Sequence, residues 1–130
     1  MITNIAEVNQ RGVRVGVTQG STSERTLPLL LANARVVPAT NLKVAIDMLG
    51  RHELDAFATN KAILYEMSKE VGGARILEGR WGAEHIAVAI PKGNEHALEY
   101  IRKFVEEART SGLVMQAAER AGLKGAVNEQ

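Results

Sequence analysis

The sequence contains no cysteine, has almost no net charge, and lacks any long apolar run. Without cysteine, neither a disulfide framework nor a zinc site with thiolate ligands can form. The 16 basic and 15 acidic side chains leave a formal net charge of +1, so there is no broad basic field to attract nucleic acid or an anionic membrane. We therefore expect no nucleic-acid partner.

The absence of long apolar runs excludes two further classes of segment. No stretch approaches the roughly 20 consecutive apolar residues of a membrane-spanning helix, and residues 1–10 lack the apolar core of a secretory signal. What the chain does have is 45% hydrophobic residues over 130 positions, enough to fill the core of one domain. A single globular domain is therefore expected.

Short apolar runs alternate with helical patterns along most of the chain. Strands are predicted at residues 13–17, 34–38, 55–59 and 85–90, with a shorter one at 75–77. Helices are predicted to begin after Ser21, Thr40 and Asn60. Because strands that alternate with helices pair in parallel, the expected fold class is α/β, a three-layer, mostly parallel sheet followed by C-terminal helices.

Capping residues mark three of the helix starts. Ser21 and Glu24 have the spacing of a capping box, and Pro28 should kink or restart that helix about two turns in. Thr40 is the expected cap of the second helix, and Asn60 is the natural N-cap of the third. These caps predict where each helix begins.

The C-terminal third reads as two helices. From Glu95 onward, apolar residues at helical spacing share one face: Leu98, Ile101, Val105 and Ala108. Gly112 separates this helix from a second one that carries Leu113 and Val114, and Gly122 is the expected C-cap. The pattern predicts an apolar stripe that needs a packing partner.

Polar residues follow the first and third predicted strands. The first strand leads into Gln19, Gly20, Ser21 and Thr22, and the third leads into Asn60. Ligands of parallel sheets bind beyond the carboxyl ends of the strands, where helix N-termini present N–H donors. If the two strands are neighbours, both turns open onto one crevice for a small ligand. Ordinary helix capping also accounts for the serine, the threonine and the asparagine.

Metal-ligating and catalytic patterns are weak. His52, His85 and His96 are far apart and lack the i, i+4 spacing of helical zinc ligands, so we predict no metal site and no cofactor. An enzyme would need a carboxylic acid or histidine in the crevice, and Glu24 qualifies only if it is not engaged in the capping box. We predict no catalytic residue and a protein that is not an enzyme.

Three segments are distinctive as written: GVRVGVTQGST at 12–22, LDAFATN at 54–60 and VAIPKG at 88–93. Together they resemble the type 2 periplasmic binding proteins that serve ABC transporters of polar amino acids, over residues 11 to about 123. The resemblance implies a periplasmic binding protein-like lobe, the second of two, followed by the C-terminal helices. It implies a solute-binding protein with a periplasmic location, although no signal peptide is found in this chain.

The resemblance also implies roles for the polar turns. Ser21 and Thr22 would contact the α-carboxylate of the ligand, with Gln19 and Gly20 beside them. Asn60 falls where many members of the family place an aspartate that pairs with the α-ammonium. An amide supplies no charge, so an ordinary amino acid would lose a charge-assisted bond of about 1.5 to 3 kcal/mol. A modified amino acid, or a carboxylate without the free amine, is therefore also open as the ligand.

The expected organisation follows from the same comparison. Residues 1–10 are an N-terminal remnant, 11–91 the α/β ligand-binding lobe, 92–124 the C-terminal helical segment, and 125–130 a tail. In the family a first lobe precedes this region and covers the C-terminal helices, so we expect a truncated form whose helical stripe pairs with another copy as a homodimer. The other expected partners are a small-molecule ligand and the membrane permease of an ABC transporter.

Two other functions stay open. One is a dehydratase-type enzyme on the same fold, which would use Glu24 or His85 as its acid or base. The other is a stand-alone protein-interaction or sensor module that binds through the helical stripe.

Overall fold

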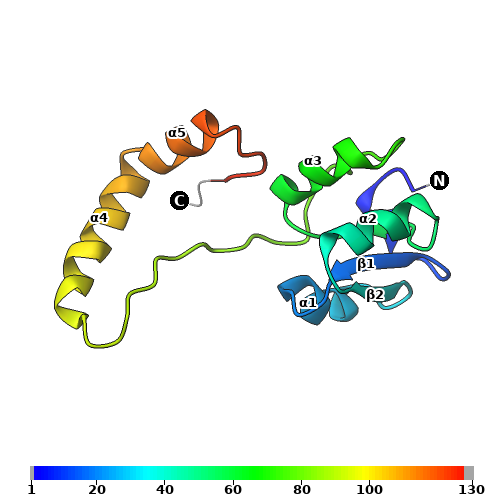
Figure 1. The fold of residues 1–130 in the computed structure, drawn as a ribbon, viewed down its shortest axis with the longest axis horizontal. Helices are drawn as coiled ribbons and strands as arrows, with labels where there is room; N and C mark the ends of the chain where they lie inside the picture. Colours follow the sequence, from blue (N-terminus) through cyan, green and yellow to red (C-terminus); the bar gives the residue numbers. More distant parts are fainter. Residues whose placement is uncertain (1, 128–130) are drawn as a thin grey trace. The chain divides into compact units, whose positions relative to one another are not determined.

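The first half of the chain forms a small parallel sheet with helices against it. The computed structural model of the protein describes residues 2–127 (Figure 1). The chain divides into two units, Met1–Ala83 and Glu84–Gln130. The boundary lies ahead of the predicted strand at 85–90, which was expected to belong to the α/β lobe.

The sheet of the first unit has three strands, all parallel. β1 (Arg14–Thr18) lies between β2 (Arg35–Ala39) and β3 (Ala56–Phe57). Val15 and Val17, two β-branched residues on one face of β1, are fully buried. The α/β class with a parallel sheet is thereby confirmed at this level.

The three helices of this unit pack against the sheet through two apolar clusters. α1 (Thr22–Leu30) joins the first cluster, which contains the buried residues Val8, Val15, Val17, Leu27, Leu31 and Ala58. α2 (Leu42–Gly50) and α3 (Lys61–Glu70) share the second, which contains Ala39, Ala45 and Met67. The helices therefore follow the strands in the alternating order that the sequence predicts.

The helix starts agree with the predicted caps at two positions of three. The side chains of Ser21 and Asn60 cap α1 and α3, as predicted. For α2 the prediction of Thr40 is wrong by one residue, because Asn41 has the extended backbone of an N-cap and its Oδ1 accepts a hydrogen bond from Val44 N at 2.9 Å. Pro28 does not split α1, which runs across it and ends two residues later at Leu30.

The N-terminal segment, predicted to be a remnant, contributes to the core. Ile5–Val8 forms a turn of 3-10 helix (η1), and Val8 is fully buried in the first cluster. Asn9 Oδ1 also accepts a hydrogen bond from Asn33 N at 2.9 Å. Sequence pattern alone missed this because four residues are too few to show a periodicity.

The predicted strands at 85–90 and 75–77 are wrong. Within the described residues, neither segment is assigned to a strand. Two apolar side chains of the first one are exposed, Ile86 at 94% and Val88 at 63%. Alternating hydrophobicity marks a chain suited to a sheet, but a strand also requires a neighbour for its backbone hydrogen bonds.

The second unit contains two α-helices, as predicted for the C-terminal third. A turn of 3-10 helix (η2, Glu95–Ala97) leads into α4 (Leu98–Thr110), and α5 (Leu113–Arg120) follows. Gly112 separates the helices with a left-handed φ of +79°. After α5, Leu123 N donates to Ala118 O and Gly122 N to Glu119 O, which is a Schellman ending with Gly122 one residue past the cap. None of the helices described has the length and apolar character to cross a bilayer.

Candidate functional site

The turn after β1 carries four of the five predicted site residues. Gln19 N extends the sheet by donating to Ala39 O at 2.8 Å, and Ser21 N donates to Thr18 O at 3.1 Å across the turn. Gly20 has φ +76°, a left-handed conformation that favours glycine. The chain therefore reverses sharply at the carboxyl end of β1 and enters α1.

The fifth predicted residue, Asn60, follows the strand that neighbours β1. Val15 pairs with Ala56 and Gly16 with Phe57 in the parallel register of β1 and β3. Ala58 N continues this ladder by donating to Gly16 O at 2.9 Å. The expected condition for a shared crevice is thus met: the two strands are neighbours, and their polar turns leave the same edge of the sheet. We call this edge, residues 19–22 and 60–61, the polar edge.

The capping box at α1 occupies part of the polar edge. Ser21 Oγ accepts a hydrogen bond from Glu24 N at 3.2 Å. Glu24 Oε2 accepts one from Gly20 N at 2.5 Å. The box forms as predicted, although the carboxylate reaches the N–H of Gly20 and not that of the cap residue itself. The carboxylate of Glu24 therefore lies beside the polar edge, at the helix start where the capping box placed it.

Several donors of the polar edge have no partner among residues 2–127. Asn60 Oδ1 accepts a hydrogen bond from Ile63 N at 3.0 Å, which leaves its Nδ2 group as a donor. The hydroxyl of Thr22 and the side-chain amide of Gln19 make no hydrogen bond to a described residue, and both residues are exposed. These groups are available to a ligand, whereas Ser21 Oγ already has its capping bond.

Lys61 was missed by the sequence interpretation. It is the first residue of α3, directly after Asn60, and it forms no ion pair with any described residue. It brings a positively charged side chain next to Asn60 in the chain, and a carboxylate ligand would need such a charge. Its position next to the predicted Asn60 was the signal available in the sequence.

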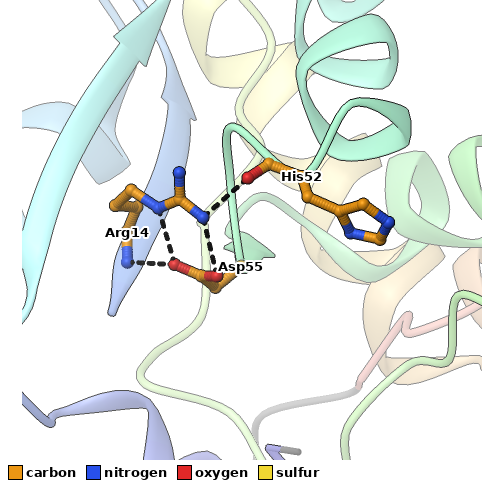
Figure 2. Close-up of polar contacts among 3 residues, drawn as sticks. All are labelled: Arg14, His52 and Asp55. Carbon is orange, nitrogen blue, oxygen red and sulfur yellow. Dashed lines mark hydrogen bonds and ion pairs between the residues drawn. The ribbon is translucent and has the colours of Figure 1, made fainter. Parts of the chain in front are cut away.

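The opposite edge of the sheet is held by an ion pair (Figure 2). Asp55 Oδ2 accepts hydrogen bonds from Arg14 N at 2.8 Å and Arg14 Nε at 2.9 Å, and Oδ1 accepts one from Nη2 at 2.9 Å. Arg14 Nη2 also donates to His52 O at 2.7 Å, and His52 has an unusual φ of +58°. The hydrogen bonds from Arg14 lower the pKa of the Asp55 carboxyl below its ordinary value. This cluster joins the starts of β1 and β3 and lies away from the polar edge.

A shallow apolar pocket lies between α2 and α3 and does not include the predicted site residues. Its volume is about 340 Å³, and its lining is made by Leu42, Ile46, Ala62, Ile63, Glu66, Met67 and Glu70. Glu66 is engaged with Lys69, whose Nζ lies 2.7 Å from its Oε1. Within the described residues, no group of three or more His, Asp or Glu side chains is arranged to hold a metal.

Comparison of the chain with known protein families, with characterised proteins and with solved structures gives no match. The class of protein is therefore defined by the fold and the site: a small α/β domain with a polar, exposed edge at the carboxyl ends of two adjacent parallel strands.

Proposed function

We propose that this protein is a solute-binding domain that holds a small amino-acid-like ligand at the polar edge and performs no chemistry on it. The observation that carries the proposal is the parallel pairing of β1 with β3, since it brings the turn at residues 19–22 and Asn60 to one edge of the sheet. The resemblance to the second lobe of a periplasmic binding protein supports the finer proposal of a transport role, with an ABC-transporter permease as partner and the periplasm as location.

The carboxylate of the ligand would bind on the α3 side of the edge. Asn60 Nδ2 is a donor, because its Oδ1 is used by the cap, and Lys61 adds a full positive charge. Donors and positive charge match a carboxylate and disfavour an ammonium at this position.

The amine of the ligand would bind on the α1 side. Glu24 is the acidic residue there, and only one of its oxygens accepts the hydrogen bond from Gly20 N. An anion would be repelled by this carboxylate, whereas an ammonium gains a charge-assisted hydrogen bond. The ligand would thus lie with its polarity reversed relative to the arrangement that the family resemblance implies, in which residues 21 and 22 contact the carboxylate.

Affinity should be low because the polar edge is open. Gln19, Gly20, Thr22 and Asn60 are all exposed, so a bound ligand keeps one side in water and its charged contacts are screened. We expect millimolar dissociation constants for free amino acids.

The ligand assignment is tested by NMR titration of the full chain with three matched probes. L-Alanine has both charges, propionate lacks the amine, and L-alaninamide lacks the carboxylate. We expect L-alanine to shift the backbone amides of residues 19–22 and 60–61 at lower concentration than either analogue. If propionate binds as tightly as L-alanine, Glu24 does not contact the amine of the ligand. The absence of shifts at these residues with all three probes would contradict the proposal.

A further inference from the structure

The segment at residues 84–92 opens the second unit and has the sequence pattern of a strand without a neighbour. Residues 84–89 are all exposed, and the exposed fraction reaches 94% at Ile86 and 63% at Val88. The backbone groups of residues 86–90 make no hydrogen bond to any described residue. An exposed apolar segment with such unpaired backbone groups is a template for pairing with another chain.

The apolar pattern of this segment is the same in both directions. Ile86, Val88 and Ile90 alternate with the alanines at 87 and 89, so an extended chain places the three branched side chains on one face. Val88 is the centre of the pattern. When two copies lie antiparallel with Val88 opposite Val88, Ile86 of each copy lies opposite Ile90 of the other. Every branched side chain then meets another on the same face.

The charges that flank the apolar residues fit the same register. Glu84 and Lys92 lie at equal distances before and after Val88, so each glutamate comes opposite the lysine of the other copy. Neither side chain forms an ion pair with a described residue. Two-fold symmetry makes this contact twice. In a parallel, in-register pair, like charges would face each other instead.

Pro91 is compatible with one of the two hydrogen-bonding patterns of this register. Alternate pairs of residues exchange backbone hydrogen bonds in an antiparallel ladder. When the two copies of Val88 form such a pair, the N–H groups of residues 86, 88 and 90 point toward the other strand, and position 91 points away from it. Proline has no N–H, so it is tolerated at an outward position of this kind. The ladder therefore loses no hydrogen bond at Pro91.

We propose that residues 84–92 pair with the same residues of a second copy as a two-stranded antiparallel ribbon about a two-fold axis at Val88. Backbone hydrogen bonds and the contacts among the isoleucines and valines supply the affinity, and the charges of Glu84 and Lys92 select the orientation. A two-stranded pair is only marginally stable by itself, so the dimer is weak. We expect a Kd between about 10 µM and 1 mM.

Sedimentation equilibrium of the full chain tests the dimer through charge reversal. E84K places lysine opposite lysine twice in each dimer, and K92E places glutamate opposite glutamate. Each should raise the dimer Kd by about three- to tenfold, the effect of reversing two exposed charge pairs. The double variant E84K/K92E restores opposite charges across the pair and should return to within about twofold of the wild type.

E78K is the matched control, because Glu78 is exposed, forms no ion pair with a described residue and lies outside the segment. It changes the net charge as E84K does and should leave the Kd within about twofold of the wild type. Far-UV circular dichroism checks that each variant keeps its helices. Two outcomes would overturn the proposal: a wild type that stays monomeric up to about 1 mM, or E84K and K92E variants that associate like the wild type.

Disulfide formation tests the antiparallel register, since the sequence has no cysteine to interfere. V88C should cross-link, because the Cα atoms of a hydrogen-bonded antiparallel pair lie about 5.5 Å apart, within the range that a disulfide spans. I86C should not, since its two copies would be offset by about 14 Å along the strands. An equimolar mixture of I86C and I90C should cross-link. Efficient cross-linking of I86C alone would indicate a parallel pair and would contradict the arrangement.

Discussion

At the scale of single residues, the side chains at the two ends of the sheet have different tasks. At the polar edge, Asn60 uses one half of its amide to cap α3 and leaves the other half free as a donor. At the opposite edge, both carboxylate oxygens of Asp55 accept hydrogen bonds from Arg14. The capping interpretation and the binding interpretation of Asn60 are therefore compatible, because they use different atoms.

The substitution Asp55→Asn tests the structural role of the ion pair. Asn keeps one acceptor and loses the charge, and the side chain of Asp55 is 35% exposed. We expect the free energy of unfolding to fall by about 1 kcal/mol, a value that allows for solvent screening. Urea denaturation measures it. Asp47→Asn makes the same charge change at an exposed position of α2 that forms no ion pair with residues 2–127, and it should be close to neutral.

The same pair predicts a dependence of stability on pH. The pKa of Asp55 is lowered in the folded protein, chiefly by the hydrogen bonds from Arg14. A group with a lowered folded-state pKa stabilises the protein above its unfolded-state pKa, and this contribution is lost as the pH falls through the folded-state value. The difference between wild type and D55N should therefore be full at neutral pH. It should shrink below the ordinary aspartate pKa of about 3.9 and vanish in stronger acid. A difference that persists there would contradict the assignment.

At the scale of elements, two of the three helix starts in the first unit were predicted correctly from nearby residues, whereas the pairing of strands was not. Ser21, Glu24 and Asn60 act within a turn of their own position, so the sequence was sufficient to place α1 and α3. The segment at 85–90 alternates as a strand should, yet a strand is defined by a neighbour that can be far away in the chain. The site depends on the pairing of β1 with β3. The sequence alone does not predict this pairing, because the two strands are far apart in the chain.

Gly16 tests how closely the elements around β1 pack. A Cβ at this position would meet the side chain of Leu54 and would lie 2.7 Å from Phe57 Cδ2. Leu54 is buried, so it has little room to move. We expect Gly16→Ala to destabilise the first unit by about 1–3 kcal/mol, as overpacking of a core does.

Gly50→Ala is the matched control, since a Cβ there meets no atom within 4 Å. It should change stability by less than about 1 kcal/mol. The single tryptophan, Trp81, belongs to the same unit as Gly16, so its fluorescence during denaturation reports on the relevant part of the chain. Equal stability of the two variants would show that Leu54 and Phe57 yield without strain.

At the scale of the whole molecule, the account combines an α/β unit that carries the polar edge with a helical unit that carries an exposed apolar face. The alternation of strands and helices was enough to predict the α/β class. The contribution of Val8 to the core emerges only from the folded chain. The described sheet has only three strands, fewer than the five that the sequence predicts. The full three-layer lobe therefore stays part of the proposal.

The most direct test of the central claim compares two lysines of α3. Lys61 lies at the polar edge, and Lys69 lies in the last turn of the same helix, paired with Glu66. L-Alanine affinity is measured by NMR titration for Lys61→Gln and for Lys69→Gln, which change the charge equally. We predict that K61Q weakens binding by about three- to tenfold, whereas K69Q stays within about twofold of wild type. Equal affinities for the two variants would contradict the placement of the ligand at the carboxyl ends of β1 and β3.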